Sequence, residues 1–193
     1  MLRLYILILT LSLAACSESP TGAGSKTTDP DGITVLEWTD LMPEGYDPSK
    51  VLPDADFEYL SDSDPNAQRY LRQMREAWSE APVVETLNER QVRIPGFVVP
   101  VEYDDKNVSE FLLVPYFGAC IHTPPPPANQ IVYVNTGGFG PSPEMLWDPV
   151  WVSGTLKTER VDNELGDAGY TLDAVSITPY ELDEESDTQG GGS

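Results

Sequence analysis

The sequence is poor in basic residues, histidine and cysteine. Its 193 residues include 11 lysines and arginines against 32 aspartates and glutamates, which gives a formal net charge of -21. A surface this negative repels phosphate backbones, so the composition argues against nucleic acid as a partner. Its more ordinary consequence is a well-hydrated, solubilising surface. One histidine and two cysteines are too few for the four Cys or His ligands of a typical structural zinc site.

An apolar run long enough to cross a bilayer is also missing from the N-terminal region. The apolar stretch Leu4 to Leu13 has about ten residues, whereas a spanning helix needs roughly twenty. This stretch follows Arg3 and precedes a LAAC sequence that ends at Cys16, which is the order of segments in an export signal. The LAAC sequence matches a lipobox, in which the cysteine is acylated before cleavage. We therefore predict a lipoprotein signal peptide over residues 1–15 and lipidation at Cys16.

Two polar segments are expected to flank the folded part. Residues 16–31 are rich in Gly, Pro, Ser and Thr and are predicted to form a flexible tether from the lipidated cysteine. The acidic tail at 181–193 ends in glycines and is predicted to be disordered. Ser17, in place of an aspartate, is typical of lipoproteins sent to the outer membrane of Gram-negative bacteria. The expected location is therefore the cell envelope, with the protein anchored at the periplasmic face of the outer membrane.

A single domain is expected over residues 32–180. Its first part, around Trp38 to Tyr46, contains prolines and a glycine, which favours an extended, docked N-terminal arm. One helix is predicted over about residues 65–80, with Pro65 at its first position. Its apolar positions recur at spacings of three and four: Leu71, Met74 and Trp78. The four tryptophans of the chain are expected in the core and at corners of the fold.

From residue 91 onward the apolar pattern has a period of two, and β-branched and aromatic residues become common. Five strands are predicted: 91–103, 110–117, 130–135, 148–158 and 170–180. The first strand is long and bends at Pro95-Gly96. Five short strands with a glycine bend in the first favour a mainly β fold, a five-stranded OB-like barrel. A five-stranded sandwich is the alternative.

The loop between the second and third predicted strands contains four consecutive prolines. These residues are stiff and close to polyproline II, because each ring fixes its own φ and restricts the preceding residue. A stiff segment without regular hydrogen bonds can present a binding edge. We predict a binding loop that comprises the following residues: Pro124, Pro125, Pro126, Pro127, Asn129 and Gln130. The alternative is a rigid corner between strands.

Cys120 and His122 are the most specific candidates for chemistry. In an extended backbone, residues two apart point to the same face, so the thiolate and the imidazole could bind one metal ion, zinc or copper. Carboxylates would have to complete the site, and the candidates are Glu102, Asp104, Asp105, Glu144 and Asp148. Two alternatives stay open. Cys120 could be a buried apolar residue with His122 bonded to the backbone, or a nucleophile with His122 as base and Asn129 as orienting group.

Several segments together resemble a family of bacterial envelope proteins classified only as a domain of unknown function. They are the RIPGFVVP segment that begins at Arg93, the FLLVPYFGACIHTPPPPANQ segment at 111–130, the PVWVSG segment at 149–154 and the WTDLMPEGY arm at 38–46. FGACIH followed by the proline run is the most distinctive part. The resemblance implies an exported protein or lipoprotein, in some members encoded beside components of ATP-binding-cassette (ABC) transport systems and linked with zinc handling.

The expected function is therefore a membrane-anchored accessory or binding module. The membrane, through the lipid anchor, and ABC-transporter components are the expected partners, with zinc as the expected cofactor if a metal is bound. One alternative is a scaffolding lipoprotein without a small-molecule site. Another is a thiol-dependent hydrolase, although the acidic, proline-rich surroundings of Cys120 favour an unreactive thiol over a nucleophile.

Overall fold

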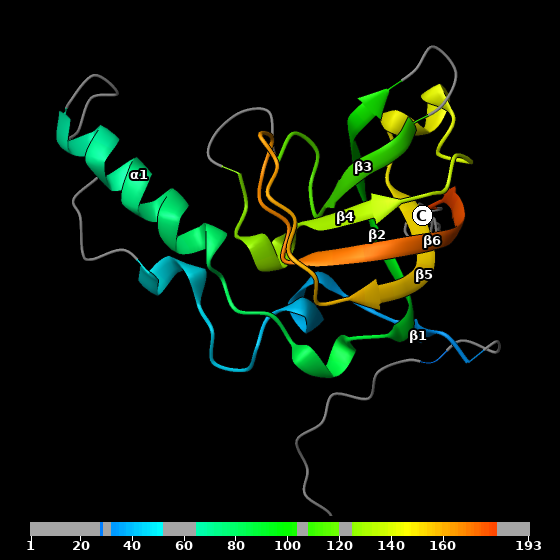
Figure 1. Ribbon diagram of the computed structural model, residues 1–193, viewed down its shortest axis with the longest axis horizontal. Coiled ribbons are helices and arrows are strands. Elements are labelled where there is room, and N and C mark those ends of the chain that lie inside the picture. The colour runs from blue at the N-terminus through cyan, green and yellow to red at the C-terminus, as the bar shows by residue number, and fades with distance from the viewer. Residues whose placement is uncertain (1–27, 29–31, 52–64, 104–107, 120–124, 181–193) are drawn as a thin grey trace, which may run out of the picture.

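The computed structural model describes residue 28 and residues 32–51, 65–103, 108–119 and 125–180. The predicted signal peptide, nearly all of the predicted tether and the C-terminal tail lie outside these residues. A closed β barrel forms the body, and one helix projects from it (Figure 1).

The barrel contains the five strands that the period-two segments predicted. They are β2 (Arg90–Tyr103), β3 (Val108–Val114), β4 (Val132–Asn135), β5 (Val150–Lys157) and β6 (Tyr170–Pro179). Their order around the barrel is β2-β3-β4-β6-β5, and β5 pairs back onto β2. β4 and β6 are parallel, and the other barrel pairs are antiparallel. This connectivity confirms the OB-like barrel and excludes the sandwich, because two separate sheets would not close on β2.

Several strand ends differ from the sequence-based boundaries by one to three residues, and two of these differences have a clear local cause. β3 ends at Val114 and not at 117, because Pro115 has no N–H for the ladder and the chain turns away after it. β4 starts at Val132, since Ala128–Gln130 form a short 3-10 helix, η5, before it. Both differences move aromatic or polar side chains out of the sheet and into loops.

Gly96 is the point at which the long strand β2 changes partner. Residues 90–96 pair with β5, and the segment from Phe97 onward pairs with β3. A Cβ at Gly96 would lie 2.8 Å from Cγ of Leu113 and 2.9 Å from the carbonyl oxygen of Val114. Only glycine lets the two backbones come this close, so the predicted glycine bend is confirmed and closes the barrel.

The inside of the barrel is filled by alternate residues of its strands. Val92, Ile94, Phe111 and Leu113 are completely buried there. Alternation of this kind sends the intervening side chains to the outer face. The interior is therefore a packed core and not a ligand cavity.

The N-terminal arm adds an extra strand and plugs the barrel. β1 (Thr34–Val35) pairs in parallel with β2, and the 3-10 helix η1 (Trp38–Leu41) follows it. Leu36 and Leu41 are fully buried in the barrel core. The arm is docked as predicted, but it contains helical turns where an extended chain was expected.

The predicted helix is present as α1 (Pro65–Ser79). It follows the short 3-10 helix η2 (Pro48–Val51) in the described part of the chain and packs against it. The indole N–H of Trp78 donates to the carbonyl oxygen of Pro48 at 3.2 Å. Among the described residues, no helix is long and apolar enough to cross a membrane.

Candidate binding surface

The residues predicted to bind metal or lipid lie largely outside the described part of the chain. This applies to Cys16, Cys120, His122 and Pro124, and to the carboxylates Asp104 and Asp105. Glu144 and Asp148 are exposed in the loop between β4 and β5. Within the described residues, no group of three or more His, Cys, Asp or Glu side chains is placed to hold a metal ion. The metal site therefore stays a prediction.

The described half of the proline loop is packed into the molecule. Pro126, Pro127 and Asn129 are buried. The amide of Asn129 donates to the carbonyl oxygen of Pro82 at 2.8 Å. The amide of Gln130 donates to the carbonyl oxygen of Trp38, also at 2.8 Å. These side chains hold the arm and the segment after α1 against the barrel, so they have a structural role; their role as a binding loop stays a prediction.

The outer face of β3 and β4 is covered by the chain itself. Leu112, Val114 and Ile131 are fully buried in a second apolar cluster outside the barrel wall. Ala119 from the loop after β3 and Ala168 from the loop before β6 pack over them. We call this region the covered outer face. OB barrels often bind oligonucleotides on the equivalent strands, but here the chain's own loops occupy that position.

By contrast, the outer face at the bend of β2 contains a groove of about 410 Å³. Its main lining residues are Trp38, Pro95, Trp151 and Tyr180. The indole N–H of Trp38 donates to the carbonyl oxygen of Pro95 at 2.7 Å, and Pro95 pairs with Trp151 across β2 and β5. β5 starts where β6 ends (Figure 1). Trp151 and Tyr180 therefore come together, with ring centroids 5.0 Å apart.

Arg93 adds a positive charge beside this groove. Its guanidinium carbon lies 4.7 Å above the centroid of the Trp151 ring, within the range of a cation–π interaction. The Nε of Arg93 is buried and has no hydrogen-bond acceptor among the described residues. The stacked indole and guanidinium make a rigid wall, because each limits the rotamers of the other.

A second group of aromatic rings lies further along β2, where the half-buried Phe97 also packs against the second apolar cluster. Phe97 lies two residues beyond Pro95 on β2, and its ring makes an edge contact with Phe117 at 6.0 Å between centroids. Phe117 in turn lies 6.3 Å from Trp147. Phe117 is 57% exposed and Trp147 is 72% exposed. Trp147 was expected in the core or at a corner, and the structure places it at a corner with most of its ring in solvent.

The groove and the exposed rings together form one aromatic surface, which runs along the outer face of the bent strand. It consists of Trp38, Phe97, Phe117, Trp147, Trp151 and Tyr180. Sequence reasoning missed it as a unit, because its members come from five separate segments. The signal that could have found it is the aromatic pair Tyr116-Phe117 directly after a strand that stops at a proline.

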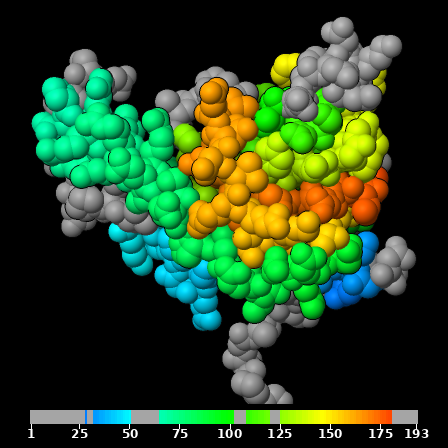
Figure 2. Space-filling view, in the orientation of Figure 1, coloured from blue at the N-terminus to red at the C-terminus, as the bar shows by residue number. Residues whose placement is uncertain are grey.

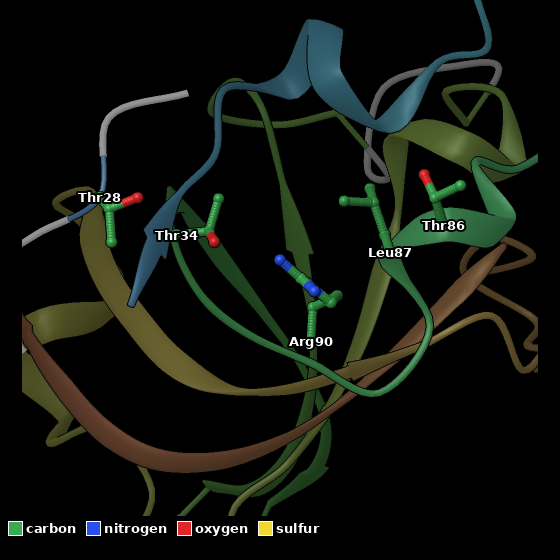
Figure 3. A pocket seen from close by; sticks show the side chains of 5 residues that line it. All are labelled: Thr28, Thr34, Thr86, Leu87 and Arg90. Atoms are coloured by element: carbon green, nitrogen blue, oxygen red, sulfur yellow. The ribbon is translucent and has the colours of Figure 1, made fainter. Parts of the chain in front are cut away.

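A second pocket, of about 370 Å³, lies between the N-terminal arm and the start of β2. It is lined by Thr28, Thr34, Thr86, Leu87 and Arg90, and the guanidinium of Arg90 points into it between Thr34 and Leu87 (Figure 3). The lining has hydroxyl groups and one cation but includes no carboxylate or thiol among the described residues.

The shifted ionisable groups lie away from the aromatic surface. Burial raises the pKa of Tyr170 to about 12. The hydroxyl of Tyr170 donates to the carbonyl oxygen of Leu41 at 2.8 Å and accepts from the N–H of Val84 at 2.6 Å. Tyr170 thus joins the arm and the segment after α1 to the barrel, which is a structural role.

The fold and this surface define a small OB-like barrel protein whose open face is aromatic. The chain belongs to the DUF3299 family, described as a protein of unknown function, whose model matches residues 38–179. It is also similar to the crystal structure of a DUF3299 family protein from Pseudomonas aeruginosa PAO1. That chain shares 40% sequence identity with a TM-score of 0.61, and the match covers 78% of this chain and 97% of the other. Among curated proteins, none matches this chain.

These comparisons confirm the resemblance at the level of a family of unknown function. The FGACIH signature as a family marker and the setting beside transport genes stay predictions.

Proposed function

We propose that this protein is a membrane-tethered binding module of the bacterial envelope, which docks a partner protein through the aromatic surface. The observation that carries this proposal is the exposure of Phe117 and Trp147, at 57% and 72%, next to the groove. Tryptophan and tyrosine dominate the binding energy of protein interfaces, whereas large apolar side chains are rarely left together in solvent. The sequence supports the tether, because the LAAC sequence ends at Cys16.

A protein partner fits this surface better than a small substrate. Small ligands are usually enclosed over most of their surface, and the rings of Phe117 and Trp147 instead stand open beside a groove. Nor does the groove supply a catalytic pair: Glu37 is its one ionisable lining side chain besides Tyr180 among the described residues. A scaffolding lipoprotein without a small-molecule site is therefore included in this proposal, and a hydrolase is not favoured.

Nucleic acid is a poor fit for two independent reasons. The formal charge of -21 repels phosphates. The face of the barrel that would stack bases is the covered outer face, where Leu112 and Ile131 are already buried by the chain's own loops.

The finer part of the proposal is that the partner is a component of an ABC transport system and that Cys120 and His122 bind zinc. The support is the family resemblance and the spacing of the two residues. The envelope location at the outer membrane rests on Ser17 after the lipobox cysteine.

Photo-crosslinking in the living bacterium tests the docking surface. A photoreactive residue replaces Trp147 in one strain and Val175 in another, since Val175 is also apolar and 68% exposed but lies in β6 outside the aromatic surface. The expected result is a protein adduct at position 147 and none at 175. The adduct is identified by mass spectrometry, which also tests the transport assignment.

Binding of the identified partner is then measured with purified proteins. Removal of a central aromatic anchor costs about 2 kcal/mol or more of binding free energy. W147A with F117A should therefore raise the dissociation constant about thirtyfold. V175A should leave it unchanged. Equal adducts at both positions, or equal affinity of both variants, would refute the proposed surface.

Elemental analysis tests the metal assignment separately. Residues 17–193, purified without chelator or affinity metal, should contain one metal ion per chain that is lost in C120S and H122A. Metal-free protein that still binds its partner would remove zinc from the proposal and leave the docking function intact.

A further inference from the structure

α1 is a basic element in an acidic protein. Its fifteen residues contain three arginines and one glutamate, while the whole chain has a formal charge of -21. Arg69, Arg72 and Arg75 follow one another at spacings of three, and all are exposed. Residues at this spacing are neighbours along one side of a helix, so the arginines form a continuous basic row.

The helix also stands away from the barrel. Its C-terminal end is held to the body, where the guanidinium of Arg160 donates to the carbonyl oxygens of Ser79 at 2.7 Å and Ala81 at 2.5 Å. From there α1 protrudes from the barrel, as the ribbon and the space-filling view both show (Figures 1 and 2). None of its residues, all of which the structure describes, is buried. Arg75 lies near the body, where it lines a small pocket with Pro126 and Asp167. Arg69 and Arg72 lie nearer the free end of the helix, where a large, flat partner can reach them.

An apolar stripe accompanies the basic row. Leu71, Met74 and Trp78 lie at spacings of three and four, and Leu71, at the edge of this stripe, is 41% exposed. Leu71 and Arg75 are four residues apart and therefore adjacent on the helix. Trp78 is turned toward the protein, where its indole N–H donates to the carbonyl oxygen of Pro48. Leu71 is therefore the member of the stripe that is open to solvent beside the arginines.

We propose that α1 docks on an anionic lipid surface, with Arg69 and Arg72 contacting lipid phosphates. Charge complementarity selects this occupant, because the basic row is the part of an otherwise acidic molecule that such a surface attracts. The guanidinium fork suits phosphate geometry. The docked helix would turn the acidic barrel away from the bilayer.

The predicted lipid anchor fits an orientation in which the barrel is turned away from the bilayer. This orientation rests on the proposed function, whereas the binding of α1 to lipid does not. A flexible tether over residues 16–31 has a typical reach of about 20–25 Å, so it keeps the helix near the membrane. Stable attachment commonly needs an acyl anchor together with a basic patch. The helix would supply that second contact and fix how the aromatic surface faces its partner.

Vesicle flotation of unlipidated residues 17–193 tests the inference without the anchor. The probes are vesicles of phosphatidylcholine alone and of equimolar phosphatidylcholine and phosphatidylglycerol, at about 0.1 M and about 0.5 M salt. We expect binding to the anionic vesicles at the lower salt concentration, little at the higher one, and none to the neutral vesicles. Each basic residue at an anionic surface contributes about a fivefold factor, so R69Q with R72Q should weaken binding on the order of thirtyfold.

The matched control, R90Q with K157Q, removes the same charge from β2 and β5 and should bind as the parent does. Gln is a good helix former, so the α1 variant should keep its circular dichroism spectrum. Failure of the parent to bind anionic vesicles would overturn the inference. Equal losses of vesicle binding in the two variants would also overturn it. So would R69Q with R72Q that binds vesicles as the parent does but loses its partner crosslinks, since the helix would then face a protein. The vesicle results do not bear on the crosslinks that position 147 makes in the protein with its arginines unchanged.

Discussion

Two parts of the barrel's outer surface carry similar apolar side chains but differ in what lies over them. On the covered outer face, Leu112, Val114 and Ile131 are fully buried in a cluster with Ala119 and Ala168, which come from the loops after β3 and before β6. Along the bend of β2, Phe117 and Trp147 contact each other and still remain more than half exposed. The chain therefore has enough loop to cover one face and leaves the other open.

This difference separates packing from binding. An apolar side chain covered by its own chain contributes to stability, whereas one left in solvent contributes little until a partner covers it. Both places carry large apolar residues, so residue type alone does not tell which of them is covered. Substitutions should distinguish the two faces, because the expected loss in the free energy of unfolding decreases from the covered face to the open one.

The largest loss of stability is expected for L112A. Leu112 is fully buried in the second cluster, so its truncation leaves a cavity between β3 and the covering loops and should cost about 2–5 kcal/mol in the free energy of unfolding. Urea denaturation followed by tryptophan fluorescence measures this loss. A cost below about 1 kcal/mol would mean that the loops do not pack on this face as described.

A smaller loss is expected for G96A, which tests the bend between the two faces. The new methyl group would lie 2.8 Å from Cγ of Leu113 and 2.9 Å from the carbonyl oxygen of Val114. Such crowding forces the strands apart and should cost about 1–3 kcal/mol by the same denaturation assay. G45A is a suitable comparison, since a Cβ at Gly45 meets no atom within 4 Å and only its positive φ opposes the change. A neutral G96A would show that closure of the barrel does not depend on this contact.

Y170F should cost about 1–2 kcal/mol, because the N–H of Val84 and the carbonyl oxygen of Leu41 both lose their partner. The pH dependence should change as well. The folded-state pKa of Tyr170 is raised from 10.0 to about 12, so its contribution to stability is complete below pH 10 and is lost as the pH rises to 12. Wild-type protein should lose up to about 1.4 kcal/mol per pH unit more than Y170F in this window. Parallel pH profiles of the two proteins would contradict the buried hydroxyl.

The smallest change in stability is expected for W147A, at about 0.5 kcal/mol or less, because Trp147 is 72% exposed. The same substitution should have the largest effect on partner binding. Measurement of both quantities on W147A and L112A gives the sharpest form of the comparison: one variant should lose binding with its fold intact, and the other should lose stability. If W147A were as destabilising as L112A, the aromatic surface would be part of the core.

Much of the fold could be predicted because local rules decide it. The period-two segments gave the barrel strands, and the glycine bend at Gly96 and the helix that begins at Pro65 were placed correctly. The strand ends were predicted less accurately. β3 ends before Pro115, and the η5 turn delays the start of β4, and neither feature appears in the period-two pattern. The aromatic surface could not be predicted, since its side chains come from segments that meet only when β5 pairs with both β2 and β6.

By itself, the sequence determined the elements, the negative charge and the lipobox pattern that ends at Cys16, because these depend on residue type, spacing and order along the chain. Tertiary structure alone decided which apolar side chains are covered. Burial is a property of what packs against a residue, and for Ile131 and Trp147 the answer comes from loops distant in sequence. The same packing decided that α1 projects from the barrel, which the apolar period of the helix does not predict.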